Sequence, residues 1–325
     1  MNDNILEIKN LTINYVTKAS TVEAVNDVTL SLSHGETLGL VGETGAGKTT
    51  TALGILRLIT EPVGQIKQGE IIFEGEDLLK KPIKDMRHIR GNKISMIFQD
   101  PMTSLNPILT VGDQIAEVVQ LHEKCSAAQA TVKAQEMLEL VGIPGDRYSE
   151  YPHQFSGGMK QRVVIAISLA CNPNLIIADE PTTALDVTIQ AQVLDLMKSL
   201  KKEFNTSMLL ITHDLGVVAE VCDKVAIMYA GRIVERGTIE EIYANPRHPY
   251  TIGLFGSIPD LDDDKERLTP IQGLMPDPSN LPKGCAFAPR CPHCTDACLA
   301  GQPQETKLSD THFIRCILEE KGGIQ

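Results

Sequence analysis

The amino-acid sequence predicts an α/β protein with a doubly wound, mainly parallel sheet. Short apolar segments with strand character alternate along the chain with longer segments that have helical spacing. Two of the apolar segments end in polar motifs, one rich in glycine and one acidic. We therefore expect helices on both faces of the sheet and two polar motifs at strand ends.

The first 80 residues predict mainly strands. Residues 5–16 alternate apolar and polar side chains, as in a half-buried strand. Residues 25–42 predict two strands joined by a turn at His34 and Gly35, and residues 70–78 predict a further strand. Residues 49–59 have helical spacing. We expect these strands to include a small antiparallel β subdomain.

The middle of the chain predicts a helical insertion between two sheet-forming parts. Residues 93–100 predict a short buried strand, after which residues 110–141 have helical spacing. The sequence FSGG at Phe155 then opens another helix. We expect the helical subdomain to occupy about residues 101–165.

The segments from residue 174 to residue 237 continue the alternation of strands and helices, which ends near Pro246. They predict a strand at 174–181, a helix at 187–204, a strand at 207–214 and a hairpin at 223–237. From Pro246 onwards the sequence is irregular and rich in proline. We expect a main domain over residues 1–250 and a small C-terminal extension over residues 251–325.

The composition limits the class of function. Of the 325 residues 42% are apolar and 4% are aromatic, so aliphatic side chains must fill the core. The net charge of −12 opposes the coating of nucleic acid, although it permits the binding of one nucleotide. No segment approaches the roughly 18–20 apolar residues of a membrane span, and no secretory signal opens the chain. We expect a soluble protein made in the cytosol, whose membrane role depends on partners.

Five of the eight cysteines crowd into the C-terminal extension. In a cytosolic protein such a cluster indicates a metal site rather than disulfides. Four thiolates can hold a [4Fe–4S] cluster or a tetrahedral Zn²⁺ ion, and an extension without metal also stays open. The five are Cys285, Cys291, Cys294, Cys298 and Cys316.

The glycine-rich motif, GETGAGKT, matches the pattern G-x-x-x-x-G-K-[ST] of a phosphate-binding loop, or P-loop. Its glycines allow successive backbone N–H groups to point at phosphates. Lys48 should reach the β- and γ-phosphates, and the Thr49 hydroxyl should bind Mg²⁺. The predicted ATP-binding residues here are Gly42, Glu43, Thr44, Gly45, Ala46, Gly47, Lys48, Thr49 and Thr50.

The acidic motif follows the predicted strand at 174–181. An apolar strand that ends in two carboxylates is what Mg²⁺-nucleotide chemistry needs. Asp179 should bind in the Mg²⁺ shell, and Glu180 should polarise the attacking water as general base. By itself such a pair more often marks a solvated turn, but beside a P-loop it is strong support for a nucleotide site.

Further motifs give the chain its resemblance to a family, the ABC ATPases. Residues 155–159, FSGGM, resemble the family's signature LSGGQ. Gln99 resembles the glutamine of the Q-loop, and the segment Ala184-Leu185-Asp186 resembles the D-loop. His213 resembles the switch histidine, and Tyr15 stands where the family places an aromatic ring on adenine.

The resemblance implies a two-protomer ATPase. Ser156, Gly157 and Gly158 would close on the γ-phosphate held by a second ABC ATPase subunit, identical to this chain or related to it. His213 would contact that phosphate and position the water with Glu180, and Gln99 would contribute to the Mg²⁺ site. Asp186 would also belong to the nucleotide site. Hydrolysis would then release the two protomers.

Three departures from the family pattern are mild. Phe155 replaces the leucine and Met159 the glutamine of the signature, and both lie outside the Ser-Gly-Gly phosphate contact. Thr183 replaces a serine at the start of the D-loop. We expect an active site, because the P-loop lysine, both carboxylates and the switch histidine are present.

The segment QDPMTSLNP, from Gln99, and the segment from His248 to Thr251 resemble the oligopeptide and dipeptide importers of the family. That resemblance implies transmembrane permease subunits, an extracytoplasmic substrate-binding protein and a place on the cytoplasmic face of the membrane. It also favours a structural [4Fe–4S] cluster on Cys285, Cys291, Cys298 and Cys316, with Cys294 as a free thiol. A Zn²⁺ site with Cys294 as a ligand stays open as the alternative. The same subfamily serves nickel and other solutes.

Two other classes of protein fit the sequence less well. A non-transport ABC ATPase that acts on DNA or ribosomes usually carries a long coiled-coil insertion or two tandem cassettes, and the sequence has neither. A P-loop kinase of another family would lack the SGG signature. The sequence therefore favours an ATPase that powers import of small peptides.

Overall fold

The computed structural model of the chain describes residues 3–183, 185–257 and 270–320. The chain divides into two compact units. The first consists of Met1–Leu6, Leu32–Thr37 and Phe73–Ile211. The second consists of Glu7–Ser31, Leu38–Ile72 and Thr212–Gln325.

Three parallel strands form the sheet of the first unit. They lie in the order β8 (Ser207–Thr212), β7 (Leu175–Asp179) and β6 (Ile94–Ile97). Every residue of β7 and β8 is buried, as expected for parallel strands covered on both faces. This arrangement confirms the parallel α/β sheet that the alternation of strands and helices predicts.

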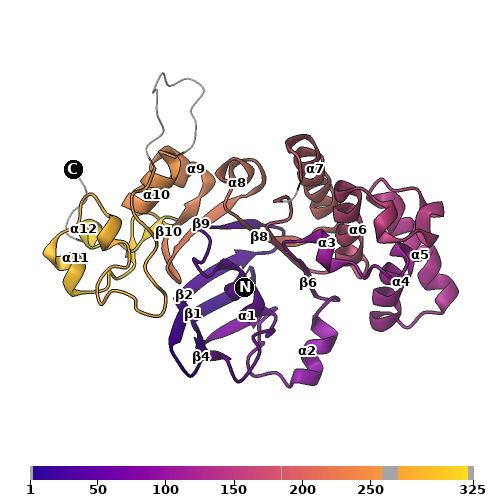
Figure 1. The fold of residues 1–325 in the computed structure, drawn as a ribbon, viewed down its shortest axis with the longest axis horizontal. Coiled ribbons are helices and arrows are strands. Elements are labelled where there is room, and N and C mark those ends of the chain that lie inside the picture. The colour runs from indigo at the N-terminus through magenta and orange to yellow at the C-terminus, as the bar shows by residue number, and fades with distance from the viewer. Residues whose placement is uncertain (1–2, 184, 258–269, 321–325) are drawn as a thin grey trace. The chain divides into compact units, whose positions relative to one another are not determined.

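The predicted helical insertion consists of α4 (Val111–His122) and α5 (Ala127–Leu140), which lie side by side in Figure 1. Thr110 caps α4 by accepting a hydrogen bond from the Asp113 N–H at 3.1 Å, and Ser126 caps α5 in a capping box with Gln129. Apolar residues of both helices, among them Ile115 and Leu138, are fully buried.

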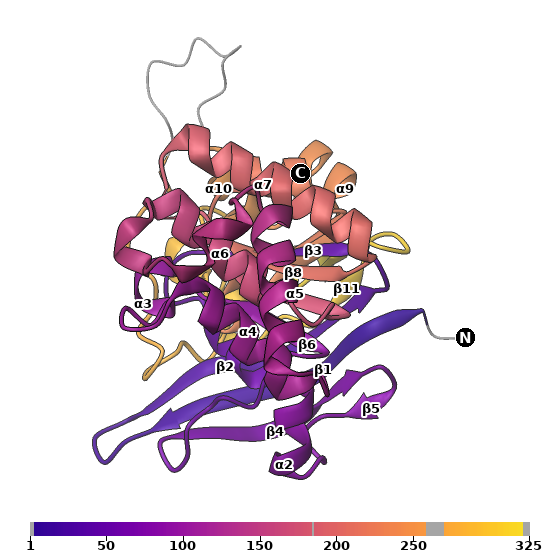
Figure 2. The same cartoon turned by 90° about the vertical axis from the view of Figure 1, so that its right-hand side faces the viewer.

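Helices α6 (Gly157–Leu169) and α7 (Val187–Phe204) pack against one another in the same unit, as Figure 2 shows. The α7 helix buries Val193, Leu194 and Met197 and ends at Asn205 in the left-handed conformation. The remaining elements of the unit are β5 (Glu76–Asp77), α2 (Ile83–Ile89), α3 (Pro101–Ser104), η1 (Gly145–Ser149) and η2 (Pro152–Gln154).

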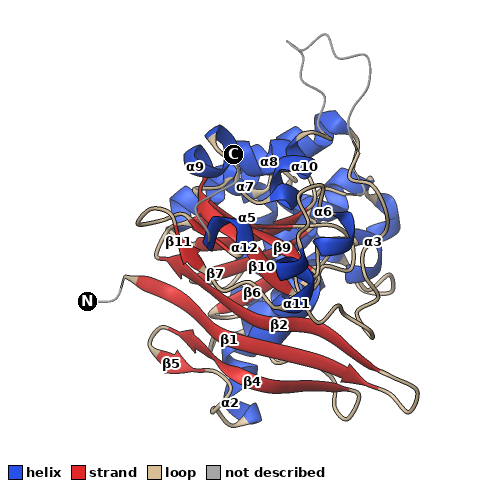
Figure 3. Ribbon diagram, turned by 90° about the vertical axis from the view of Figure 1, so that its left-hand side faces the viewer, coloured by secondary structure: helices blue, strands red, loops and turns tan. Residues whose placement is uncertain are grey.

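The second unit contains two groups of strands. In one of them, β1 (Asn4–Val16, which starts in the first unit) lies between β2 (Thr21–Ser33) and β4 (Gly64–Phe73), as Figure 3 shows. The Asn10 amide on β1 donates to the Asp27 carboxylate on β2 at 2.8 Å. The apolar residues of β1 that alternate in the sequence, such as Leu11 and Ile13, are buried.

The other group of strands leads to the P-loop. Strand β3 (Thr37–Val41) pairs in parallel with β9 (Lys224–Tyr229), which forms the predicted antiparallel hairpin with β10 (Arg232–Thr238). Ala230 and Gly231 turn the hairpin with positive φ angles of 45° and 82°. Strands β11 (Thr306–Lys307) and β12 (Phe313–Ile314) extend this sheet, because β12 pairs with β10.

A buried carboxylate holds the C-terminal part of the second unit together. Glu235 on β10 is fully buried, and it accepts hydrogen bonds from the backbone N–H groups of Arg247 and His248 and pairs with the His312 ring at 2.8 Å. These groups outweigh the cost of burial and lower the pKa of Glu235. Burial lowers the pKa of His248 to about 4, so this ring is neutral at pH 7.

The helices of the second unit are short. They are α1 (Lys48–Ile55), α8 (Leu215–Val221), α9 (Ile239–Ala244), α10 (Pro249–Phe255), η3 (Ala288–Arg290), α11 (Asp296–Ala300) and α12 (Ile317–Glu320).

Candidate nucleotide-binding site

The P-loop connects β3 to α1 in the second unit, as the sequence predicts. Gly45 and Gly47 have φ angles of 84° and 105°, which only glycine adopts without strain. A Cβ atom at Gly42 would lie 2.1 Å from the Met228 carbonyl oxygen, so the loop starts in close contact with β9. The glycines therefore serve both the curvature of the loop and its packing.

The Lys48 side chain is buried and folds back along the loop that it belongs to. Its ammonium group donates to the carbonyl oxygens of Gly42 at 2.6 Å and Glu43 at 3.1 Å. Lys48 is also the first residue of α1, so its charge lies at a helix N-terminus, where an anion is favoured. Thr44, Gly45 and Thr49 belong to the same motif and are exposed to solvent. This donor set fits a nucleotide phosphate with Mg²⁺.

Two further predicted residues of the second unit lie at the ends of strands. Tyr15 is half-buried near the end of β1, where a Cβ atom at Gly64 would approach its ring to 3.2 Å. His213 is exposed directly after β8, and the following Asp214 caps α8 by accepting from the Val217 N–H at 3.2 Å. Their contacts with adenine and with the γ-phosphate stay predictions.

The first unit brings Glu180 and Gln99 together at the ends of β7 and β6. The Gln99 amide donates to the Glu180 carboxylate at 2.8 Å, and the Thr183 hydroxyl donates to the same oxygen at 3.0 Å. Asp179, the last residue of β7, has an exposed fraction of 2%. One carboxylate is thus buried at the strand end, and the next is more accessible and oriented by two donors.

Glu180 has a strained backbone that the sequence does not reveal. Its φ angle is 46°, in the left-handed region that a glutamate rarely adopts, and its N–H donates to the Ile211 carbonyl oxygen at 2.8 Å. Such strain costs about 1–3 kcal/mol and concentrates at functional sites. It turns the chain sharply after β7 and gives Glu180 its direction.

The signature segment forms the N-terminus of α6. Ser156 caps this helix by accepting from the Met159 N–H at 3.4 Å, and both Ser156 and Gly157 are exposed. A Cβ atom at Gly158 would lie 2.5 Å from the Ile189 side chain on α7. Gly158 thus permits the close approach of α6 and α7, a packing role that the motif alone does not show.

One departure from the signature, Phe155, is explained by packing. Phe155 is buried beneath the Arg147 guanidinium, which lies 4.4 Å from the ring centroid. The predicted D-loop lies just before α7. Asp186 caps α7 by accepting from the Ile189 N–H at 3.0 Å, and Ala184 lies outside the described residues. The binding of nucleotide by Asp186 stays a prediction.

Tyr250, at the end of the main domain, and Arg290, in the C-terminal extension, contact the P-loop, and sequence reasoning missed both contacts. The Arg290 guanidinium donates to the Glu43 carboxylate at 2.7 and 3.1 Å, and the Tyr250 hydroxyl accepts from the Glu43 N–H at 3.0 Å. Tyr250 belongs to the segment that resembles the peptide importers, but no spacing rule relates it to residue 43.

The five C-terminal cysteines form no disulfide with one another: Cys298 and Cys316 are buried, Cys285 and Cys291 are half-buried, and Cys294 is exposed. Throughout the described ranges, no group of three or more His, Cys, Asp or Glu side chains is arranged to hold a metal ion. Burial raises the pKa of the Cys285 thiol, and the neighbouring thiols of Cys316 and Cys298 raise it further. Burial likewise raises the pKa of Cys291 to about 11, with contributions from Cys285, Cys316 and Cys298.

These interactions separate four cysteines from the fifth. Cys285, Cys291, Cys298 and Cys316 all lie within electrostatic reach of one another. Cys294 is exposed, and desolvation together with the neighbouring Cys298 thiol raises its pKa. The role of these four cysteines as metal ligands stays a prediction.

Comparison with known proteins places the chain in a family. The ABC transporter family matches residues 25–183, and the family "Oligopeptide/dipeptide transporter, C-terminal region" matches residues 234–298. The oligopeptide transport ATP-binding protein OppD of Bacillus subtilis (strain 168) is 54% identical over 96% of this chain and 88% of its own length. The dipeptide transport ATP-binding protein DppD of the same organism is 50% identical over 98% of this chain and 96% of its own length.

A solved structure agrees with these relatives. The ATP-binding cassette MJ0796, in a dimeric post-hydrolysis state bound to ADP and Pi, has a TM-score of 0.65 and 27% identity, covering 72% of this chain and 98% of its own. Among the helices of the described residues, none is long and apolar enough to cross a bilayer. The chain therefore belongs to the ABC transporter family, as an ATPase subunit that carries the oligopeptide/dipeptide transporter C-terminal region.

Proposed function

We propose that the chain hydrolyses ATP to power the import of dipeptides or oligopeptides across the cytoplasmic membrane. The observation that carries this proposal is the likeness to peptide transport ATP-binding proteins at 50–54% identity over nearly the whole chain. The geometry supports the ATPase part, because Glu180 is oriented by Gln99 and Thr183 at the end of a buried strand.

Each motif has a proposed task in hydrolysis. The P-loop amides and Lys48 bind the phosphates, Tyr15 stacks on adenine, and Glu180 accepts the proton of the attacking water with His213 beside it. Thr49, Gln99 and Asp179 hold Mg²⁺, which when bound neutralises charge on the phosphates. The proposed domains are a nucleotide-binding domain at 1–250, with its helical subdomain at about 101–165, and an extension at 251–325.

The signature segment is proposed to act on a second ATPase subunit. The exposed Ser156 and Gly157 offer a hydroxyl and free amides at a helix N-terminus, which is an anion site. The dimeric state of the solved cassette supports a sandwich of two protomers. The partner is a second copy or, as the subfamily suggests, a related subunit.

The remaining partners are proposed to lie in the membrane and outside the cell. Permease subunits would contact the segment that follows β6, where Phe98 and Ile108 have exposed fractions of 45% and 78%. The chain would lie on the cytoplasmic face, and a substrate-binding protein would deliver peptide to the permease. We expect no nucleic-acid partner.

Transport tests the proposed function directly. In cells that lack the gene, uptake of a radiolabelled dipeptide or tripeptide should fall to background and return with the wild-type gene. Uptake of radiolabelled nickel, measured in parallel, should not change. Loss of nickel uptake alone would contradict peptide import, and co-purification with ribosomes or DNA instead of permeases would favour a non-transport ATPase.

We also propose a structural [4Fe–4S] cluster on Cys285, Cys291, Cys298 and Cys316. The resemblance to the peptide importers favours iron–sulfur, a group in which each thiolate would bind a different iron. A Zn²⁺ ion on the same thiolates is the alternative. The cluster would stabilise an extension that is too small for a large core of its own.

Replacing Cys285 with Ser is expected to remove the bound metal. Cys285 is half-buried and donates through its N–H to the Cys298 carbonyl oxygen at 2.8 Å, so the backbone of the site should survive the change. Iron and sulfide should be assayed on anaerobically purified protein, with zinc measured in the same samples. Cys294→Ser is the matched control and should keep its iron. Unchanged iron in Cys285→Ser would count against the cluster.

A further inference from the structure

The C-terminal extension reaches the P-loop through an ion pair between a buried arginine and a half-buried glutamate. The Arg290 side chain has an exposed fraction of 6%, and its two terminal nitrogens donate to the two oxygens of Glu43 at 2.7 and 3.1 Å. Glu43 is the second residue of the P-loop. Two parallel hydrogen bonds fix the direction of both groups, which a single contact would not do.

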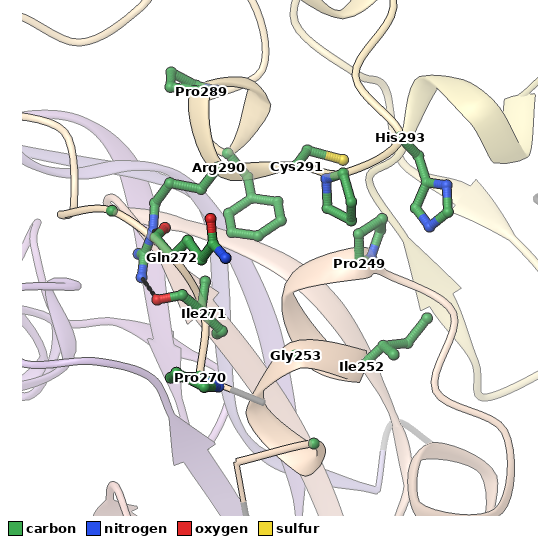
Figure 4. A pocket seen from close by; sticks show the side chains of 14 residues that line it. Pro249, Ile252, Gly253, Pro270, Ile271, Gln272, Pro289, Arg290, Cys291 and His293 are labelled. Atoms are coloured by element: carbon green, nitrogen blue, oxygen red, sulfur yellow. Dashed lines mark hydrogen bonds between the residues drawn. The ribbon is translucent and has the colours of Figure 1, made fainter. Parts of the chain in front are cut away.

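The other N–H groups of the Arg290 guanidinium also donate hydrogen bonds. The Arg290 Nε–H donates to the Gln272 carbonyl oxygen at 3.0 Å, and the terminal nitrogens also donate to the Ile271 carbonyl oxygen at 3.5 Å and the Tyr229 hydroxyl at 3.3 Å. Figure 4 shows the side chain extended towards the backbone of Ile271. All five N–H donors of the guanidinium have an acceptor, so its position is set before any nucleotide arrives.

Tyr250 holds the backbone of the same P-loop residue. Its hydroxyl accepts from the Glu43 N–H at 3.0 Å, and its side chain is fully buried. The Tyr250 ring packs on Tyr229 and Phe287, with centroids 4.6 and 5.4 Å away. Glu43 is thus held twice, by Arg290 through its side chain and by Tyr250 through its N–H.

The negative charge of Glu43 explains why these contacts matter. A carboxylate on a P-loop would repel the phosphates that the loop binds. Arg290 neutralises the Glu43 charge, and the paired donors direct the carboxylate towards the extension. Without Arg290 the charge would be uncompensated next to the triphosphate.

We infer that Arg290 and Tyr250 are positioning residues of the nucleotide site, which hold Glu43 and keep its charge away from the phosphates of ATP. The inference rests on the proposed nucleotide site and adds the C-terminal extension to it. Because Arg290 directly precedes Cys291, the segment that carries one of the proposed metal ligands also holds the P-loop.

Nucleotide affinity of the full chain tests the inference. Arg290→Ala is expected to raise the Kd for a fluorescent ATP analogue with Mg²⁺ about tenfold. The KM for ATP should rise with it, while kcat at saturating ATP stays close to wild type. Adding Glu43→Gln to Arg290→Ala removes the uncompensated charge and should restore most of the affinity. A merely structural role for Arg290 would give no such rescue.

The controls separate this inference from the proposed site. Arg236→Ala removes another two-bonded pair of the same unit, with Glu305 at 3.0 and 3.3 Å, and should leave the Kd unchanged. Lys48→Ala should abolish binding; if it does not, the proposed nucleotide site itself is wrong. If Lys48→Ala fails to bind while Arg290→Ala binds like wild type, only the positioning role is overturned.

Tyr250→Phe covers the case in which Arg290→Ala does not fold. It removes the oxygen that accepts from Glu43 and keeps the ring that packs on Tyr229 and Phe287. We expect a weaker affinity for the analogue at an unchanged kcat. Wild-type affinity in this variant, or a further loss when Glu43→Gln is added to Arg290→Ala, would also overturn the inference.

Discussion

Replacing Glu180 with Gln is expected to lower the rate of ATP hydrolysis by about 10²–10⁴-fold, because the amide cannot accept the proton of the attacking water. Binding of ATP should persist. The glutamine oxygen can still accept from the Gln99 amide and the Thr183 hydroxyl, which lie 2.8 and 3.0 Å from the carboxylate. The side chain should therefore keep its place while it loses its basicity.

Phosphate release, the Kd for a fluorescent ATP analogue, and size-exclusion chromatography with ATP measure the three parts of this expectation. The variant should accumulate an ATP-bound dimer, whereas the wild-type dimer should dissociate after hydrolysis. Thr183→Val is the matched control, since it removes one hydrogen bond to Glu180 and leaves the carboxylate, so it should retain most of the turnover. Turnover of Glu180→Gln near the wild-type rate would refute the role of Glu180 as base.

Replacing Gly47 with Ala is expected to weaken ATP binding by at least about 100-fold. The φ angle of Gly47 is 105°, and an added Cβ atom would lie 2.3 Å from the Ala24 carbonyl oxygen and 2.8 Å from the Met228 side chain. Backbone strain of this kind costs about 1–3 kcal/mol, and the contact with backbone adds to it. The loop must therefore leave the conformation that presents its amides.

Gly45→Ala provides the matched comparison. Gly45 also has a positive φ, 84°, but a Cβ atom there would have no neighbour within 4 Å. This variant should lose affinity through backbone strain alone and so bind ATP more tightly than Gly47→Ala. Titration with the analogue and thermal unfolding of both variants would measure the difference. Equal affinities would show that the contact with Ala24 does not matter.

Much of the local structure follows from patterns in the sequence. The strand before the P-loop, the hairpin of β9 and β10, the helical insertion, and the start of α6 at the signature all form where the sequence predicts them. These elements depend on apolar periodicity, on caps such as Thr110 and Ser126, and on positive-φ turns, which all act within a few residues. The family comparison confirms the fold class and the ATPase.

Contacts between distant parts of the chain could not be predicted from these local patterns. The pairing of β12 with β10 joins Ile314 to Glu235, and the Arg290 guanidinium meets Glu43 across 247 residues. Neither contact is signalled by a hydrophobic period or by a motif spacing in the sequence. The left-handed φ of Glu180 is likewise imposed by its surroundings, since a glutamate has no local preference for it.

The sequence by itself determined the chemistry of this protein, because a P-loop, an acidic strand end and a signature helix are short motifs whose spacing reflects local backbone geometry. Only the tertiary structure decided which residues support them. It oriented Glu180 through Gln99 and Thr183 and joined the C-terminal extension to the P-loop. Such support comes from side chains that packing brings together, and packing depends on the whole fold rather than on neighbours in the chain.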